Sequence, residues 1–294
     1  MFFRLAIKSL LNRKGSIIMT LMAISVAIFV LLGIEHIRHQ ARDSFASTVS
    51  GVDLIVGAKT GSLNLLLYSV FRVGTPTDNI SWASYKDISS NPGVAWSVPI
   101  SLGDSHQGYR VLGTTTAYFE HFSYGNKRKL SFSAGTPFDA THNVVLGSEV
   151  AAALGYSLGA QIILSHGIAS TSFTQHKNHP FQITGILDQT GTPVDQTIHV
   201  PLAGIEAMHA RGSGSLGISS PKEPPQKKIH EDLTPESITA FLLGLNSKMM
   251  IFGVQREINT YKKEPMLAIL PGVALSELWQ MVGLFEDVLR LISA

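Results

Sequence analysis

Apolar and polar positions divide the chain into one long uncharged run and many shorter periodic segments. The run spans Ile17 to Ile34, eighteen residues without a charge, Pro, Asn or Gln. As a helix it would be about 27 Å long, close to the hydrocarbon thickness of a bilayer. A signal peptide would need a shorter run and a small-residue cleavage site, whereas this run continues into EHIRHQARD. We therefore predict a transmembrane helix at residues 17–34.

The charges on either side of the run predict its direction. The basic residues that precede it are Arg4, Lys8, Arg13 and Lys14. The far side begins with Glu35 and carries both signs of charge. By the positive-inside rule the N-terminus is cytoplasmic, and the chain from about residue 35 onward lies outside. Residues 1–16 are predicted to be an amphipathic lead-in at the cytoplasmic membrane surface, with anionic lipid as the partner of its charge.

Beyond the membrane, apolar residues recur at steps of three and four positions. They are Ile34, Ile37, Ala41, Phe45 and Val49. This spacing predicts that the helix continues outward as an amphipathic stalk over residues 35–50 and ends at Gly51. The apolar stripe needs a partner surface, and both the external domain of the same chain and a second subunit satisfy that need.

After Gly51 the pattern changes to short apolar runs separated by Gly, Pro and Asn, which predicts a mixed α/β domain over residues 51–272. Its first half is expected to hold strands at Asp53–Val56, Val94–Leu102 and Tyr109–Thr115 and helices at Leu63–Arg72 and Trp82–Ser89. Ser81 is placed to cap the second helix, and Asn91-Pro92-Gly93 to stop it.

The most regular part of the chain is NVVLGSEVAAALGYSLGAQIILSHG, which begins at Asn143. It predicts a strand at Val144–Leu146, a helix at Glu149–Leu154 with Ser148 as N-cap and Gly155 at C′, and a strand at Gln161–Ser165. Further strands are expected at Phe181–Leu187, Thr197–Val200, Ile238–Leu245 and Met266–Leu270, and helices at Leu202–His209 (Pro201 at its first position), Lys248–Tyr261 and Leu275–Leu291. Residues 211–235, rich in Gly, Ser, Pro and Lys, predict a flexible outer loop.

Composition narrows the function classes. The 294 residues carry a formal net charge of +2, and the basic residues outside the N-terminus are scattered, so nucleic acid is not an expected partner. Cysteine is absent, which excludes disulfides, cysteine-ligated metals and cysteine nucleophiles.

The segment GAKTGS is the nearest approach to a nucleotide-binding motif. A Walker A loop requires Gly directly before Lys, but here Ala58 separates Gly57 from Lys59. No GxSxG or HExxH motif occurs either, and we predict no catalytic, cofactor-binding or metal-binding residue.

Histidines and aspartates offer the remaining candidates for chemistry. His36 and His39 lie three apart at the membrane exit, and His176 and His179 flank the loop TQHKNHP. Neither pair has a third metal ligand, so we interpret all four as ordinary surface histidines and keep zinc as an alternative. Asp53 lies at a strand start, and Asp188 and Asp195 lie around Gln189-Thr190-Gly191, all at places where turns favour Asp. We expect the three to bond the local backbone.

These elements and motifs together resemble the permease subunits of the MacB/FtsX-like ABC transporter family, which includes lipoprotein-releasing and macrolide-export permeases. The resemblance is carried by the basic lead-in, GVDLIVGAKTGS with PTDNI downstream, NVVLGSEVAAALGYSLGAQI, FQITGIL and IHVPL. It implies an α+β fold, in which a transmembrane helix enters a large extracytoplasmic domain of two α/β lobes, the MacB-like periplasmic core domain. It also implies the bacterial inner membrane as location.

The resemblance implies a permease that couples ATP hydrolysis by a cytoplasmic ABC ATPase to extracytoplasmic motion, paired with a second permease copy or homologue. Family members have three more membrane helices, which residues 273–294 would lead into as an amphipathic helix. That helix carries four charges and cannot itself span a bilayer, so we expect the chain to be truncated. The alternative is a membrane-anchored extracytoplasmic binding module without an ATPase, with a periplasmic protein or zinc as its partner.

Overall fold

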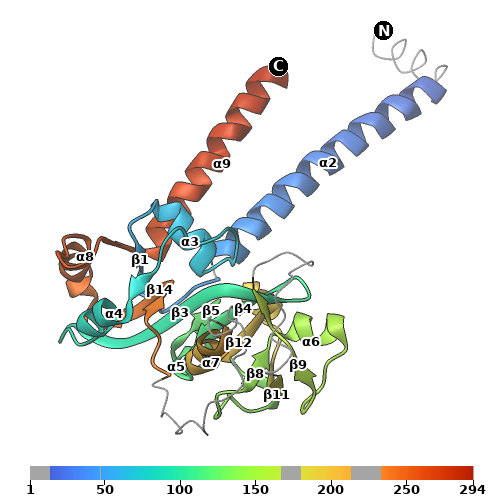
Figure 1. The fold of residues 1–294 in the computed structure, drawn as a ribbon. Coiled ribbons are helices and arrows are strands. Elements are labelled where there is room, and N and C mark those ends of the chain that lie inside the picture. Colours follow the sequence, from blue (N-terminus) through green and yellow to red (C-terminus); the bar gives the residue numbers. More distant parts are fainter. Residues whose placement is uncertain (1–13, 47, 167–179, 213–232, 294) are drawn as a thin grey trace, which may run out of the picture. The chain divides into compact units, whose positions relative to one another are not determined.

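The structure, a computed structural model, describes residues 14–46, 48–166, 180–212 and 233–293. Two compact units make up the chain, Met1–Phe45 and Ala46–Ala294. Figure 1 shows the elements of both units.

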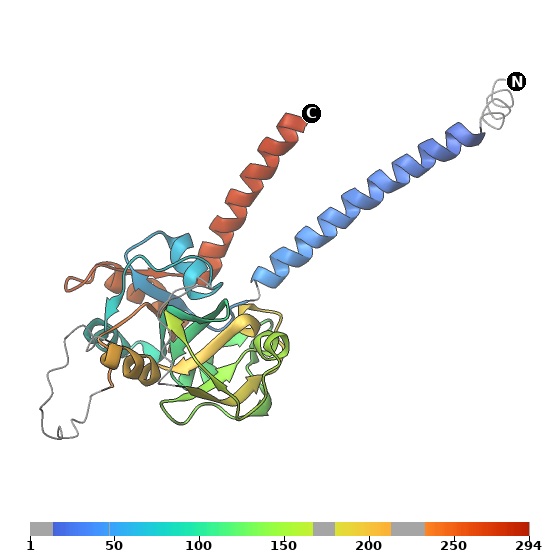
Figure 2. The ribbon, with the colours of Figure 1, turned by 45° about the vertical axis from the view of Figure 1, so that its right-hand side comes forward.

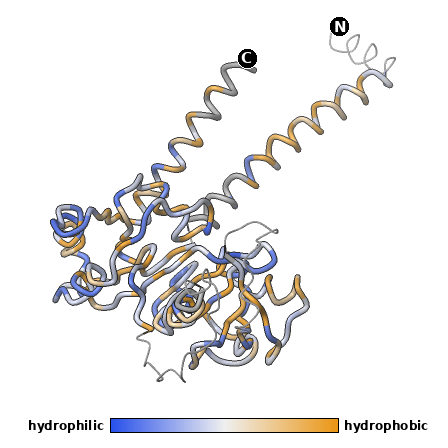
Figure 3. The backbone as a smooth tube through the Cα atoms, viewed as in Figure 1, coloured by the Kyte–Doolittle hydropathy of each residue, from blue (hydrophilic) through white to orange (hydrophobic). Residues whose placement is uncertain are grey.

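The first unit is formed by helix α2, Lys14–Ala46. Its part Lys14–Ile37 is long and apolar enough to cross a membrane, and it contains the predicted span 17–34. Apolar side chains of this part are exposed; Met19 is 73% exposed and Phe29 is 78% exposed. Figure 3 shows hydrophobic residues along the length of this helix. A helix that is apolar all round suits a lipid environment better than water.

The predicted stalk is helical over most, but not all, of residues 35–50. Helix α2 ends at Ala46, because the following backbone takes another partner: the N–H of Ser50 donates to the carbonyl of Ser123 at 2.9 Å. Of the stripe residues, Val49 packs against the core of the second unit, while Ile34 and Ile37 are exposed. The side chains of the other two stripe residues, Ala41 and Phe45, lie outside the described ones.

The second unit contains the remaining helices and the sheet. Its helices are α3 Ser62–Ser69, α4 Trp82–Ser89, α5 Ala117–His121, α6 Ser148–Leu154, α7 Leu202–Gly212, α8 Ile251–Asn259 and α9 Pro271–Ser293, with 3₁₀ turns η1 Pro193–Gln196 and η2 Lys248–Met250. Its strands are β1 Leu54–Ala58, β2 Ile80–Ser81, β3 Val94–His106, β4 Tyr109–Thr114, β5 Ser123–Tyr124, β6 Arg128–Lys129, β7 Phe132–Gly135, β8 Asn143–Leu146, β9 Gln161–Ile162, β10 Ser165–His166, β11 Phe181–Leu187, β12 Thr197–Pro201, β13 Ser237–Ile238, β14 Ala240–Leu245 and β15 Met266–Ile269.

Eleven strands of the described chain form one mixed sheet, in the order β15-β1-β14-β3-β4-β12-β8-β11-β7, with β10 on β3 and β9 on β11. Strand β3 lies in the interior of this order and pairs with different strands along its length. Residues 94–100 pair with β14, and residues 101–106 pair with β4 and β10. We call β15, β1, β14 and the first part of β3 the first half-sheet, and the strands beyond it the second half-sheet. Figures 1 and 2 show β3 running from one to the other.

The central strands of the first half-sheet are buried on both faces. Along β1, Leu54 and Val56 enter one core cluster and Ile55 enters another, as the two-residue period of a strand requires. Helices α4 and α8 cover the first of these clusters, and α3 and the start of α9 cover the second. The cluster under α3 also contains residues of α5, β4, β8 and β11, so the two half-sheets share a core.

The sequence predicted the fold class and most elements correctly, including the N-cap of α4, where the N–H of Ser84 donates to Ser81 Oγ at 3.2 Å. Gly155 ends α6 in the left-handed conformation, with φ of +66°. Ser148, however, is not an N-cap. The carbonyl of Gly147 accepts the first helical bond of α6, and any side chain at Gly147 would lie 2.3 Å from the carbonyls of Val194 and Asp195.

Other boundaries also differ from the prediction. Pro201 is the last residue of β12 rather than the first of α7, and the expected strand Ile238–Leu245 is interrupted at Thr239, whose hydroxyl accepts from Leu102 N at 3.0 Å. The expected helix Lys248–Tyr261 is a 3₁₀ turn followed by α8, which ends at Asn259. Most of the predicted loop 211–235 lies outside the described residues.

Candidate transmission site

The strand that follows α2 and the strand that precedes α9 are neighbours in the sheet. Strand β1 begins eight residues after Ala46, and α9 begins after a single residue, Leu270, beyond β15. The two strands pair antiparallel, with Ile55 opposite Ile269. The chain therefore enters and leaves the first half-sheet at the same end of one strand ladder.

Helix α9 packs against the rest of the second unit over its first two turns. Ala274 and Leu275 are buried in the same core cluster as Leu65 and Leu66 of α3. At the rim of this contact, Ser62 Oγ donates to a carboxylate oxygen of Glu277 at 2.6 Å. Beyond these turns α9 projects as a straight helix, as Figures 1 and 2 show.

Side chains of α8 satisfy the free edge of β15. The amide nitrogen of Ala268 donates to Asn259 Oδ1 at 2.7 Å, and its carbonyl accepts from Gln255 Nε2 at 3.0 Å. An edge strand otherwise presents unpaired backbone groups to water or to other chains. Strand β15 is thus fixed on one side by β1 and on the other by α8.

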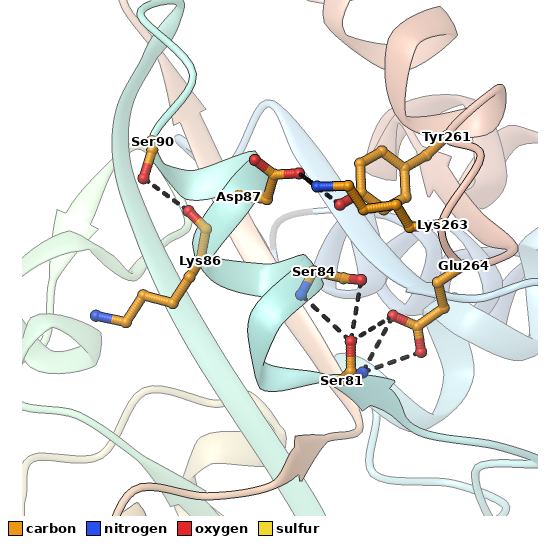
Figure 4. Close-up of polar contacts among 8 residues, drawn as sticks. All are labelled: Ser81, Ser84, Lys86, Asp87, Ser90, Tyr261, Lys263 and Glu264. Atoms are coloured by element: carbon orange, nitrogen blue, oxygen red, sulfur yellow. Dashed lines mark hydrogen bonds and ion pairs between the residues drawn. The ribbon is translucent and has the colours of Figure 1, made fainter.

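The loop between α8 and β15 is bound to the first turn of α4 (Figure 4). Glu264 accepts from Ser81 N at 3.0 Å and from Ser81 Oγ at 2.8 Å, while Ser81 Oγ also accepts from Ser84 N. A carboxylate at a helix N-terminus is favoured because the helix dipole and the unpaired N–H groups both attract negative charge. Glu264 therefore extends the cap of α4 and ties β15 to it.

A second set of contacts joins the same loop to the middle of α4. Asp87 accepts from the hydroxyl of Tyr261 at 2.6 Å and from Lys263 Nζ at 2.9 Å (Figure 4). These two hydrogen bonds lower the pKa of Asp87, and the bond to Asp87 raises the pKa of Lys263. The Lys263 side chain is 73% exposed and that of Asp87 is 49% exposed, so the ion pair contributes little to stability. Its main effect is to orient the loop between α8 and β15 relative to α4.

A depression of about 360 Å³ lies between α4 and this loop, lined by Ser81, Ala83, Ser84, Tyr261, Lys263 and Glu264. Its polar groups already bond to one another across the gap, as the distances above record. We interpret it as the seam of a structural contact.

Gly57 explains the nucleotide-like sequence GAKTGS in structural terms. It lies inside β1, and a Cβ at this position would lie 2.4 Å from Leu65 Cδ1 and 2.7 Å from the hydroxyl of Tyr68. Glycine here lets α3 pack directly on the strand. The rejection of a Walker A loop is consistent with this role, because no loop forms at Gly57.

Comparison with known proteins bears on the origin of this architecture. Residues 17–228, more than half of the chain, match the sequence model of the MacB-like periplasmic core domain. The chain belongs to this family. Among the curated proteins, none matches the chain.

Two solved structures are similar to this MacB-like domain at low sequence identity. The periplasmic region of MacB from Actinobacillus actinomycetemcomitans is 10% identical, with 80% of this chain and 94% of that chain covered and a TM-score of 0.48. The extracellular domain of the noncanonic ABC-type transporter YknZ from Gram-positive bacteria is 11% identical, with 74% and 98% covered and a TM-score of 0.41. The family assignment rests on the sequence match alone.

The MacB-like domain places the predicted aspartates in structural roles. Asp195 bonds its own turn, accepting from Thr190 N at 2.8 Å and Gly191 N at 2.7 Å, as expected. Asp53 binds a backbone N–H as well, but that of Leu245 in the neighbouring strand β14, so its bond is not local. Asp188 is fixed through its own N–H, which donates to the carbonyl of Ser131.

The predicted histidines are not brought together with other ligands in the described part of the domain. His36 is exposed on α2, while the side chain of His39 and both His176 and His179 lie outside the described residues. Among the described residues, no group of three His, Asp or Glu side chains could hold a metal ion.

Sequence reasoning missed a buried polar cluster where the half-sheets meet. His199 of β12 is fully buried, with its ring 5.3 Å from that of Tyr118 and 5.7 Å from that of Phe119. Burial, together with the positive charge of Arg72, lowers the pKa of His199 to about 3. The motif IHVPL contains His199, but nothing in its sequence pattern reveals that the imidazole faces the core.

Proposed function

We propose that this MacB-like chain is part of an ABC transporter permease that works by mechanical transmission. The observation that carries the proposal is the pairing of β1 with β15, which joins the elements following α2 and preceding α9 in one strand ladder. Displacement of membrane-side helices would reach the sheet through these two strands together. No residue of this chain is assigned a catalytic role, and ATP hydrolysis belongs to a cytoplasmic ABC ATPase partner.

The stiffness of the α9 connection supports this proposal. A single residue, Leu270, separates β15 from α9, and α9 is packed against α3 from Ala274 to Glu277. Its 23 residues form a lever about 35 Å long. A 10° rotation of such a lever moves its far end by about 6 Å. A small rotation at the junction with β15 therefore corresponds to a large displacement of the far end of α9.

The proposed arrangement in the cell follows from the charges around α2. By the positive-inside rule, the basic residues before the helix support a cytoplasmic N-terminus, with residues 51–272 outside the bacterial inner membrane and residues 1–16 at the lipid surface. A second permease copy or homologue supplies the other half of the transporter. Substrate export or extraction, driven by ATP, is the resulting activity.

The rival function is a membrane-anchored binding module that works without an ATPase. Affinity purification of the protein as its gene encodes it, from native membranes in mild detergent, separates the two. The permease proposal predicts an equimolar ABC ATPase with a true Walker A motif and vanadate-sensitive ATP hydrolysis in the purified complex. Recovery of the protein with neither would support the binding module.

A further inference from the structure

The segment that follows α3 has an unusual backbone. Val70 and Phe71 are buried in the shared core, and the chain then turns through Arg72, which has a φ of +59°, and Gly74, with a φ of +83°. A left-handed conformation is common for glycine but uncommon for arginine. Something other than backbone preference therefore holds Arg72 in place.

The side chain of Arg72 joins the end of α3 to α5. Its guanidinium donates to the carbonyl of Ser69 at the end of α3, and also to the hydroxyl of Tyr118 in α5 at 3.4 Å. Tyr118 is fully buried and stacks on Phe122 with ring centroids 4.9 Å apart. In Figure 1, α3 lies beside the lower end of α9, and α5 lies against β3.

A second arginine also bonds this turn. Arg110 in β4 of the second half-sheet donates from Nη2 to the carbonyl of Gly74 at 2.5 Å. The turn at residues 72–74 is thus bonded twice, once through its own side chain and once through its backbone.

Neither guanidinium is paired with a carboxylate in the described part of the chain. Burial lowers the pKa of both arginines, and the charge of Arg110 lowers that of Arg72 further. The Arg72 guanidinium, held by carbonyl and hydroxyl oxygens at a part-buried position, costs stability relative to an apolar side chain, whereas the Arg110 contact is exposed to solvent. Such groups are retained where a fixed geometry matters, which we take as the hypothesis for this turn.

We propose that Arg72 and Arg110 are positioning residues that clamp the second half-sheet to α3, so that it follows the motion of α9. This inference rests on the proposed transmission function and names the contact through which motion passes beyond the first half-sheet. The shared core provides cohesion, while the directional hydrogen bonds of the clamp fix the angle between the two parts.

The test uses the full-length protein assembled with its ATPase in lipid nanodiscs. Since the described protein chain has no native cysteine, spin labels can be placed at Gln280→Cys on α9 and Ala153→Cys on α6, both exposed positions. The clamp is removed by Arg72→Asn, because Asn tolerates the left-handed conformation, and separately by Arg110→Gln. Arg256→Gln on the exposed face of α8 is the matched control.

The label pair is expected to give one narrow distance distribution in wild type and in the Arg256→Gln control, with and without ATP and vanadate. In Arg72→Asn and Arg110→Gln it should broaden or shift by several ångströms, while the thermal midpoint changes by less than a few degrees. Distributions identical to wild type in both clamp variants would overturn the clamp. Loss of the clamp broadens the distance distribution even without nucleotide, so this result tests the clamp separately from the transmission function. The transmission function is tested by the spectrum of a single Gln280→Cys label: a spectrum that does not change with nucleotide would count against it.

Discussion

Replacing His199 is expected to remove an acid sensitivity of the second unit. A neutral imidazole is buried against Tyr118 and Phe119, and burial holds its pKa at about 3, against 6.5 for the ordinary side chain. The unfolded chain therefore binds a proton below pH 6.5 that the folded chain does not bind until about pH 3. The stability linked to His199 is complete above pH 6.5 and is lost as the pH falls from 6.5 toward 3.

The magnitude follows from the size of the pKa difference. Each unit below pH 6.5 costs about 1.4 kcal/mol, so wild type loses about 3 kcal/mol between pH 7.5 and pH 4.5 through this one residue. His199→Leu and His199→Phe cannot titrate and should not show this loss. His199→Leu should also match or exceed wild type at pH 7.5, because the fully buried imidazole lies against the rings of Tyr118 and Phe119, where an apolar side chain has no ring nitrogens to desolvate.

The assay is urea unfolding of the full-length protein in detergent, followed by tryptophan fluorescence at several pH values. The described tryptophans, Trp82, Trp96 and Trp279, all lie in the second unit, so the fluorescence reports that unit. The difference in unfolding free energy between wild type and each variant cancels the titration of all other groups. A difference that stays constant from pH 7.5 to 4.5 in both variants would refute the burial of a neutral His199.

Two further predictions concern packing and orientation. Gly57→Ala should destabilise the second unit by about 1–3 kcal/mol in the same assay, because the added Cβ would clash with Leu65. The control Gly61→Ala, whose added Cβ has open space around it, should change stability by less than half as much. Equal effects of the two substitutions would contradict the packing role of Gly57. In spheroplasts, a membrane-impermeant maleimide should label Lys262→Cys but not Ser9→Cys unless the membrane is permeabilised, and the reverse pattern would invert the proposed topology.

Local features of the fold could be predicted from the sequence because their causes are local. A helix long and apolar enough to cross a membrane follows from an uncharged run of sufficient length, and the cap at Ser81 follows from a hydroxyl placed before an apolar segment. The same reasoning failed at Ser148, because the space at Gly147 is limited by η1, more than forty residues later. It also missed β5, β6 and β7, which are two to four residues long and carry no usable periodicity.

The candidate transmission site could not be predicted, because it is made of distant partners. Ile55 pairs with Ile269, and Glu264 binds Ser81 across 183 positions. Nothing in a single sequence specifies such pairings, since each strand is compatible with several neighbours. The resemblance to permeases predicted the domain and its connections to membrane helices at both ends, but not the contacts between β1, β15, α4 and α8.

The most direct test of mechanical transmission is to soften the junction between β15 and α9. Four glycines inserted between Leu270 and Pro271 should leave ATP hydrolysis by the partner ATPase intact. The distance between Ala153→Cys labels on the two permease subunits, or between that label and one on a homologous partner, should change with nucleotide in wild type. The insertion should reduce this change by at least half. The same insertion after Asn126, in the exposed turn between β5 and β6, should leave the change as in wild type. A distance change of full size with the Leu270 insertion would contradict transmission through this junction.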